Sequence, residues 1–416
     1  MHRKKKKNTL VKLLKDLAVG GVYGLIIGLI IGFVFEMIRL DINEFGFLEF
    51  MLLFSLSVLL ALPIHVFLHE LGHWCMGLLA GLQLQFFSLF GFTWVRKRNH
   101  FVLRKNWNPF ALGQAFMTPK TSRPRWAYAL YLLGGVLFNV LFSWMFIFTA
   151  LKFENIYANA FLVIIGVLGI IMALMNLWPY DQSDGMHLKR LFQEDYYLPE
   201  FEKTCLASEA LLDAEDFDDL KEWMTIDSHA PLTSMGNLMA TTLSASQAEC
   251  QNDFKKAARI YQAIYLQRED LSRNSQLAIM REYLFALLLS NPNHKHVYQI
   301  KKDEMMQHYW EARTPESYRV RAADAFYMRF DLQEAESLLD TGSRLIDSQI
   351  YDFDQKVERQ LYEILSERVA NENLDDLKLL PKEELIIQDN KELEQIELAV
   401  DDLSDTDGGD HDEESI

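Results

Sequence analysis

The amino-acid sequence predicts an all-α polytopic membrane protein: four transmembrane helices, a short strand region at the membrane surface, and a C-terminal cytoplasmic helical domain. Apolar residues are concentrated in residues 1–190, whereas residues 191–416 have the composition of a soluble protein. Charge is segregated too, because residues 1–190 carry 19 Lys and Arg against 9 Asp and Glu, and residues 381–416 carry 2 against 14. A nucleic-acid binder would have its basic face on the soluble part, so this class is excluded.

Four apolar segments are long enough to cross a bilayer, at about residues 17–38, 48–81, 126–152 and 157–178. Roughly 20 residues at 1.5 Å each cover a hydrocarbon layer of about 30 Å. The first segment follows a basic start and is too long for the apolar core of a signal peptide, so residues 1–47 are expected to hold a retained helix. The second exceeds a single span and is expected to tilt, or to bend at Pro63.

The loop at residues 83–125 alternates between polar and apolar residues in places, which predicts short strands rather than a spanning helix. This loop holds eight Lys and Arg, and five more lie within the first seven residues, whereas the loops at 40–47 and 153–156 hold none. Basic loops stay in the cytoplasm. We therefore expect an integral multi-pass protein with both termini cytoplasmic, in a prokaryotic cytoplasmic membrane.

The soluble part divides into a predicted helical domain at residues 189–380 and an acidic tail at 381–416. Amphipathic stretches lie near 254–267, 275–290, 316–330 and 331–346. They fit either a tetratricopeptide-like solenoid or a plain helical bundle, since no clean period of about 34 residues is present. The tail has no aromatic residue and is predicted to be disordered. Three scattered cysteines form no CxxC pair, so neither a disulfide framework nor a cysteine zinc site is indicated.

The second apolar segment contains His69-Glu70-Leu71-Gly72-His73. Residues four apart share a helix face, so both imidazoles can reach one zinc ion while Glu70 lies beside the metal-bound water. Zinc lowers the pKa of that water to about 7, and the carboxylate can accept its proton as the water attacks a carbonyl. Ionisable residues inside a span are costly and usually functional. The pentapeptide therefore predicts a zinc site with Glu70 as general base.

A catalytic zinc ion normally has a third protein ligand. The best candidate is Asp184, in the polar stretch after the fourth apolar segment, where Pro179 ends the helix and Gly185 permits a tight turn. Asp181 in the same stretch is a rival ligand. Both the pentapeptide and this stretch fall near the cytoplasmic ends of their helices. Asp184 is therefore expected to face back toward His69 and His73.

Two further histidines lie close to these residues in the sequence. His65 precedes His69 by four residues, and His187 follows Asp184 by three. Each is interpreted either as an outer hydrogen-bonding partner or proton shuttle of the metal site, or as a structural or interfacial histidine.

Three motifs occur in a fixed order. They are the pentapeptide at 69–73, the segment Gly134-Gly135-Val136-Leu137-Phe138-Asn139, and Asn176-x-x-Pro179 followed by Asp184-Gly185. With these motifs the sequence resembles the site-2 protease family of intramembrane zinc metalloproteases, over residues 48–188. It departs from the family at Gly134-Gly135, where Gly-Pro is usual. Neither a PDZ domain nor a paired nucleotide-binding domain is evident, so the regulation of such relatives is not carried over.

The resemblance implies a metalloprotease core at residues 48–188 with one Zn²⁺ per chain. In that reading the zinc ligands are His69, His73 and Asp184, and Glu70 is the catalytic base. Asn139 and Asn176 would place the substrate strand or stabilise the oxyanion.

The implied activity is hydrolysis of a peptide bond within or next to a transmembrane or signal-peptide-like helix of another membrane protein. Such a helix must unwind locally, and the strand-like residues 83–105 could pair with it by edge addition. Residues 191–380 are a candidate site for a cytoplasmic regulator. The alternative is a membrane-anchored helical adaptor whose metal site is structural or vestigial. A transporter is a third reading, but the sequence shows no inverted repeat.

Overall fold

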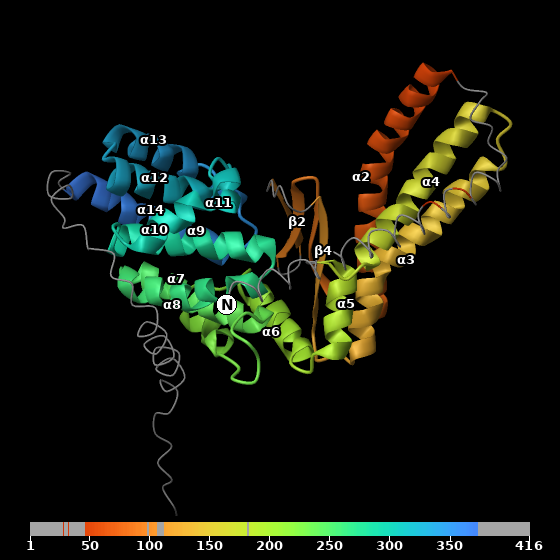
Figure 1. Cartoon of the computed structure of the whole chain (residues 1–416). Helices are drawn as coiled ribbons and strands as arrows, with labels where there is room; N and C mark the ends of the chain where they lie inside the picture. The colour runs from red at the N-terminus through yellow and green to blue at the C-terminus, as the bar shows by residue number, and fades with distance from the viewer. Residues whose placement is uncertain are drawn as a thin grey trace, which may run out of the picture. The chain divides into compact units, whose positions relative to one another are not determined.

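The computed structural model describes residues 46–97, 100–105, 112–180 and 183–372, together with Gly28 and Gly32. Apart from those two glycines, the predicted first transmembrane helix lies outside the described residues, as does the acidic tail. The chain forms two compact units (Figure 1). Unit 1 comprises residues 1–82, 113–115 and 124–189, and unit 2 comprises residues 83–112, 116–123 and 190–416.

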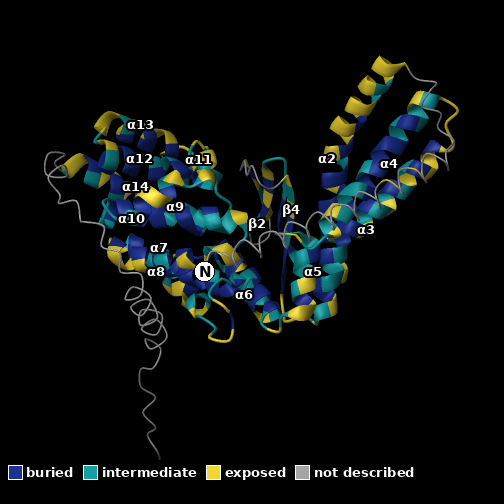
Figure 2. Cartoon of the chain, viewed as in Figure 1, coloured by how far each residue is buried: buried dark blue, intermediate teal, exposed yellow. Residues whose placement is uncertain are grey.

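Unit 1 is built on three long helices, α2 (Phe47–Leu79), α3 (Arg125–Ala150) and α4 (Ile156–Leu177), each of which packs against the other two. Among the described residues these three are long and apolar enough to cross a membrane, and they coincide with the second, third and fourth predicted segments. Helix α2 continues through Pro63 without a break. The yellow stretch of α2 in Figure 2 is its exposed apolar surface, where Leu59 is 70% exposed. A surface of this kind is typical of contact with lipid.

Helices α2 and α3 approach to backbone contact where the pentapeptide lies. A Cβ atom added at Gly72 would lie 2.3 Å from the carbonyl oxygen of Gly134, and one added at Gly134 would lie 2.4 Å from that of Gly72. Small residues at helix crossings in membranes allow this approach. Any larger residue at either position would separate the two helices.

A four-stranded sheet follows α2, with the strand order β3-β2-β1-β4. The strands are β1 (Leu82–Leu89), β2 (Phe92–Lys97), β3 (His100–Lys105) and β4 (Gly113–Pro119). Strands β1 and β2 are antiparallel and joined by Phe90 and Gly91, both at positive φ (48° and 83°), which matches a tight hairpin turn. Strand β3 pairs antiparallel with β2, placing Trp94 opposite Leu103.

The two faces of the sheet differ. On the face that packs within unit 2, Phe86 and Val95 are buried with Leu212. Arg104 on the same face donates hydrogen bonds to the carbonyl oxygens of Gln349 and Ile350, and both Arg104 and Lys97 form ion pairs with Asp352. On the opposite face Phe92, Trp94, Phe101 and Leu103 are exposed, together with Lys105 opposite Phe92. The sheet is therefore attached on one side to the helical part of unit 2.

The rest of unit 2 is helical among the described residues. Its α-helices are α6 (Tyr197–Ala210), α7 (Met235–Cys250), α8 (Phe254–Leu266), α9 (Arg273–Ser290), α10 (Lys295–Lys302), α11 (Glu304–Tyr309), α12 (Pro315–Arg329), α13 (Leu332–Ser343) and α14 (Asp352–Asn371). Three short 3-10 helices lie at η2 (Asp218–Met224), η3 (Arg268–Asp270) and η4 (Ile346–Ser348). Consecutive helices pack side by side from α6 to α9, then α9 packs on α12, α12 on α13 and α13 on α14. The four predicted amphipathic stretches coincide with α8, α9, α12 and α13.

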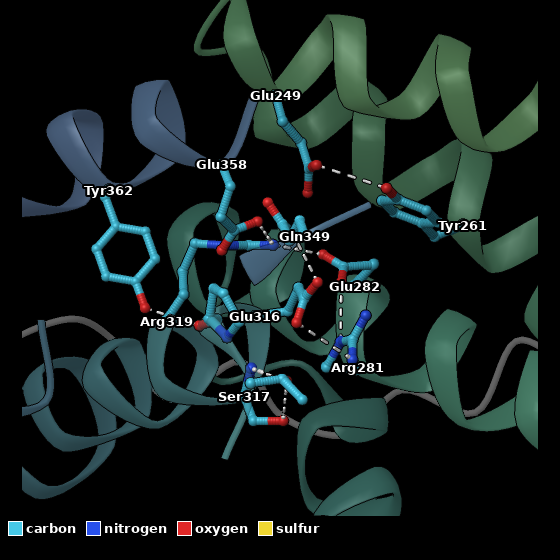
Figure 3. Close-up of polar contacts among 12 residues, drawn as sticks. Glu249, Tyr261, Arg281, Glu282, Glu316, Ser317, Arg319, Gln349, Glu358 and Tyr362 are labelled. Atoms are coloured by element: carbon cyan, nitrogen blue, oxygen red, sulfur yellow. Dashed lines mark hydrogen bonds and ion pairs between the residues drawn. The ribbon is translucent and has the colours of Figure 1, made fainter. Parts of the chain in front are cut away.

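A buried ionic network lies in the core of these helices (Figure 3). Arg319 is 1% exposed and donates to both carboxylate oxygens of Glu358, at 2.7 and 3.2 Å, and to Glu282 at 2.8 Å. Arg281 donates to the other oxygen of Glu282. Glu249 is also buried, where the hydroxyl of Tyr261 lies 3.5 Å away. Carboxylates thus outnumber guanidinium groups, so the network is acidic as a whole.

Candidate metal centre

Three ligand-type side chains of unit 1 converge at one point. The Nε2 atoms of His69 and His73 lie 3.1 Å apart. Asp184 places Oδ2 at 3.1 Å from Nε2 of His69, and Oδ1 at 3.4 Å from Nε2 of His73. Among the described residues these three form the one group of His, Cys, Asp and Glu residues whose ligand atoms lie close enough together to hold a metal ion.

The spacing of these atoms fits a tetrahedral zinc ion. With Zn–N and Zn–O distances of about 2.0–2.2 Å and tetrahedral angles, neighbouring ligand atoms lie about 3.3–3.5 Å apart. The observed separations of 3.1–3.4 Å are close to this value, and the two that involve Asp184 are measured to different oxygens of its carboxylate. Oδ2 of Asp184 is buried without a hydrogen bond, an arrangement that a cation would satisfy.

Asp184 reaches the two histidines because the chain turns back after α4. The hydroxyl of Ser183 bonds to the carbonyl oxygen of Trp178 and accepts from the backbone N–H groups of Tyr180 and Met186. Asp184 is the first residue of α5 (Asp184–Gln193). A Cβ atom on the following Gly185 would lie 1.9 Å from the carbonyl oxygen of Leu177, so only glycine lets α5 start against the end of α4. The Asp-Gly pair of the sequence motif therefore has a steric cause.

His73 is held by a backbone acceptor. Its Nδ1 atom lies 2.8 Å from the carbonyl oxygen of Tyr131 on α3, so Nδ1 carries the proton and Nε2 is free to bind a metal. This partner could not be predicted from the sequence, because a carbonyl group is present at every residue.

Glu70 is 7% exposed and lies within electrostatic range of His69, His73 and Asp184 without belonging to their ligand group. Its side chain is against β4: a Cβ atom on Gly113 would lie 2.7 Å from Cγ of Glu70, and the backbone of Ala115 hydrogen-bonds to it. The sequence predicted short strands within residues 83–125, but no alternating run falls on β4.

The remaining residues with predicted roles take separate positions. Asn139 is fully buried, with its side chain between His69 and His65. The amide of Asn176 donates to the carbonyl oxygen of Met172 on its own helix. His187 is half-buried on α5, outside the ligand group. Asp181, the rival ligand, lies outside the described residues.

In comparisons with known proteins, the chain matches no family model, no curated protein and no solved structure.

Proposed function

We propose that this protein is an intramembrane zinc metalloprotease of the site-2 protease type. The observation that carries the proposal is the convergence of His69, His73 and Asp184, whose nearest ligand atoms lie 3.1–3.4 Å apart, with Glu70 beside them. Both histidines and Glu70 lie on α2, one of three apolar helices long enough to span a membrane. A purely structural zinc site normally has four protein ligands. Three ligands together with an adjacent carboxylate are the arrangement of a hydrolytic centre.

The three ligand residues and Glu70 have separate chemical roles. When bound, a zinc ion supplies Lewis acidity and lowers the pKa of a coordinated water to about 7. The three ligand residues fix its position. Glu70 accepts the proton of the attacking water and then delivers it to the leaving amide nitrogen. The carboxylate of Glu70 is held for this role by α2 on one side and by Gly113 and Ala115 of β4 on the other.

Strand β4 is proposed to receive the substrate. It is at one end of the strand order, so among the described strands one of its edges has no neighbour. An unwound segment of a substrate helix can add to such an edge through main-chain hydrogen bonds, which place a peptide bond beside Glu70. The sequence predicted pairing through residues 83–105, and the contact between β4 and Glu70 moves the proposed pairing edge to residues 113–119.

The sheet is proposed to lie at the cytoplasmic membrane surface. Only Ala80 and Gly81 separate the end of α2 from the start of β1. The exposed face carries Trp94 and Phe101, with Arg96 opposite Phe101 in the register. Aromatic residues together with basic ones are typical of the interface between lipid and water.

The test compares the membrane proteomes of cells that contain wild-type protein or the Glu70→Gln variant. The proposal predicts at least one membrane protein whose full-length form accumulates in the variant while a soluble fragment disappears. A proteome that does not change, in cells where the wild-type protein binds zinc, would favour the adaptor with a structural metal site.

A further inference from the structure

A chain of buried hydrogen bonds runs from the metal centre through all three apolar helices. His69 directs Nε2 toward His73 and Asp184, and its Nδ1 atom lies 3.5 Å from the side-chain amide of Asn139 on α3. The other end of that amide lies 3.3 Å from Nδ1 of His65 on α2. Nε2 of His65 lies 3.0 Å from the carbonyl oxygen of Ile165 on α4. His65 and Asn139 are 0% exposed, so water cannot replace these partners.

The chemistry of the donors and acceptors determines where each proton lies. The carbonyl oxygen of Ile165 can only accept, so Nε2 of His65 carries the proton and its Nδ1 is an acceptor. The side-chain NH₂ group of Asn139 must therefore face His65, and its oxygen must face His69. This arrangement needs only a 180° rotation of the amide group about its Cβ–Cγ bond. The oxygen then accepts the Nδ1–H of His69.

We propose that His65 and Asn139 are positioning residues that fix the tautomer and ring orientation of His69. A neutral imidazole with its proton on Nδ1 has its lone pair on Nε2, the atom that faces His73 and Asp184. His73 reaches the same state directly through Tyr131. This inference rests on the metal centre of the proposed function and not on proteolysis. It gives Asn139 a role different from the substrate contact that the resemblance implies.

The rings have no room to leave this arrangement. A Cβ atom added at Gly135 would lie 2.4 Å from the imidazole of His69, and one added at Gly169 would lie 2.0 Å from that of His65. Backbone of α3 and α4 therefore covers the rings closely. This series of hydrogen bonds starts at a backbone carbonyl of α4 and ends at His69, a proposed metal ligand on α2. The packing of the three helices therefore determines which nitrogen of His69 has the lone pair that binds the metal.

The test measures the zinc dissociation constant of the full-length protein in detergent micelles, by competition with a chromophoric chelator. Asn139→Leu removes the acceptor and should weaken zinc binding by about 10- to 100-fold, the usual effect of losing such a partner. Asn139→Asp keeps an acceptor for His69 and should bind zinc within about threefold of wild type. Ser57→Ala is the control, because Ser57 is buried in α2 and, within the described part of the chain, its hydroxyl bonds only to the carbonyl oxygen of Leu53 on the same helix.

Each outcome decides the inference. Wild-type affinity in Asn139→Leu would overturn it, and so would equal losses in the Leu and Asp variants, because the loss would then not depend on an acceptor for His69. If Asn139→Leu does not fold, His65→Leu provides the second measurement. This variant should weaken zinc binding and alter the visible absorption spectrum of the Co²⁺-loaded protein. An unchanged spectrum and an unchanged affinity would overturn the role of His65. A wild-type protein that binds no zinc would overturn the metal centre together with this inference. Zinc binding without cleavage would overturn only the proposed function.

Discussion

The two histidines of the pentapeptide use their ring nitrogens in the same way but find different partners. Each presents Nε2 to the centre and Nδ1 to a neighbour, a backbone carbonyl for His73 and a side chain for His69. The sequence predicted that His69 and His73 lie close together, because residues at i and i+4 share one face of a helix. It left the role of His65 open and, through the resemblance, assigned Asn139 to the substrate strand or the oxyanion. Their contacts could not be predicted, because they join residues 74 and 70 positions apart in the chain.

Removal of the carboxylate ligand tests the choice between the two aspartates. Asp184→Ala should lose bound zinc, since it removes the two oxygen atoms at 3.1 and 3.4 Å from the histidine nitrogens. Asp181→Ala should keep stoichiometric zinc. Metal content of the purified variants, measured by mass spectrometry, gives the answer, and the reverse pattern would assign the third ligand to Asp181.

At the scale of elements, the three long apolar helices and the amphipathic helices could be predicted because their patterns are local. The sheet was predicted only in part. The alternating runs mark β1, β2 and β3, whereas β4 has no clear alternation and is defined by its place beside β1. Attachment of the sheet to the helical part of unit 2 was not predictable. It depends on contacts between Arg104 and residues 349–352, which are distant in the sequence.

Arg104 is the main polar attachment between β3 and the segment that precedes α14. Arg104→Ala removes the bonds to two carbonyl groups and the ion pair with Asp352, and should lower the free energy of unfolding of unit 2 by about 1–3 kcal/mol. Limited proteolysis should then cut the β-strand region sooner. Lys105→Ala, on the same strand but exposed, is the matched control. Equal protease resistance in both variants would rule out this attachment.

The buried network predicts a pH dependence for the helices of unit 2. Burial, only partly offset by Arg319 and reinforced by Glu316, raises the pKa of Glu358 to about 7. The folded state therefore keeps a proton that the unfolded chain releases near pH 4.5, so this group destabilises the fold as pH rises from about 4.5 to 7. Glu358→Gln removes this dependence.

Thermal unfolding of both proteins at pH 5 and pH 8 measures the effect. Wild type should lose about 1–3 kcal/mol relative to Glu358→Gln over this interval, roughly 2–4 °C in Tm for each kcal/mol. Titrating groups whose pKa does not depend on Glu358, such as His296, are shared by both proteins and cancel in the difference. The pKa of Asp354 depends in part on Glu358, so Asp354 contributes to the measured effect. Parallel pH profiles would show that Glu358 is ionised throughout.

At the scale of the whole molecule, the segregation of charge and apolar residues predicted a membrane part followed by a helical part, and the structure has both kinds of element. The division into units follows different borders, because residues 83–112 and 116–123 belong with the helices of unit 2. No sequence pattern marks this border. It arises where Phe86 and Val95 find apolar partners more than a hundred residues away.

Topology is a property of the whole chain, and the basic loops predict that both termini are cytoplasmic. A reporter enzyme that works only outside the cytoplasm, fused after Arg190, should be inactive, whereas one fused within residues 153–156 should be active. Activity of the first fusion would contradict the four-span arrangement and the cytoplasmic position of Asp184.

The most direct test of the proposed protease compares zinc content and cleavage in wild type and Glu70→Gln, purified in detergent and supplied with a substrate found by the proteome comparison. The amide of Gln cannot accept the proton of the attacking water, while His69, His73 and Asp184 are unchanged. We expect both proteins to hold one zinc ion per chain, and cleavage by the variant to fall about 10²- to 10⁴-fold. A zinc-loaded variant that retains more than about a tenth of wild-type activity would contradict the assignment of Glu70 as the base.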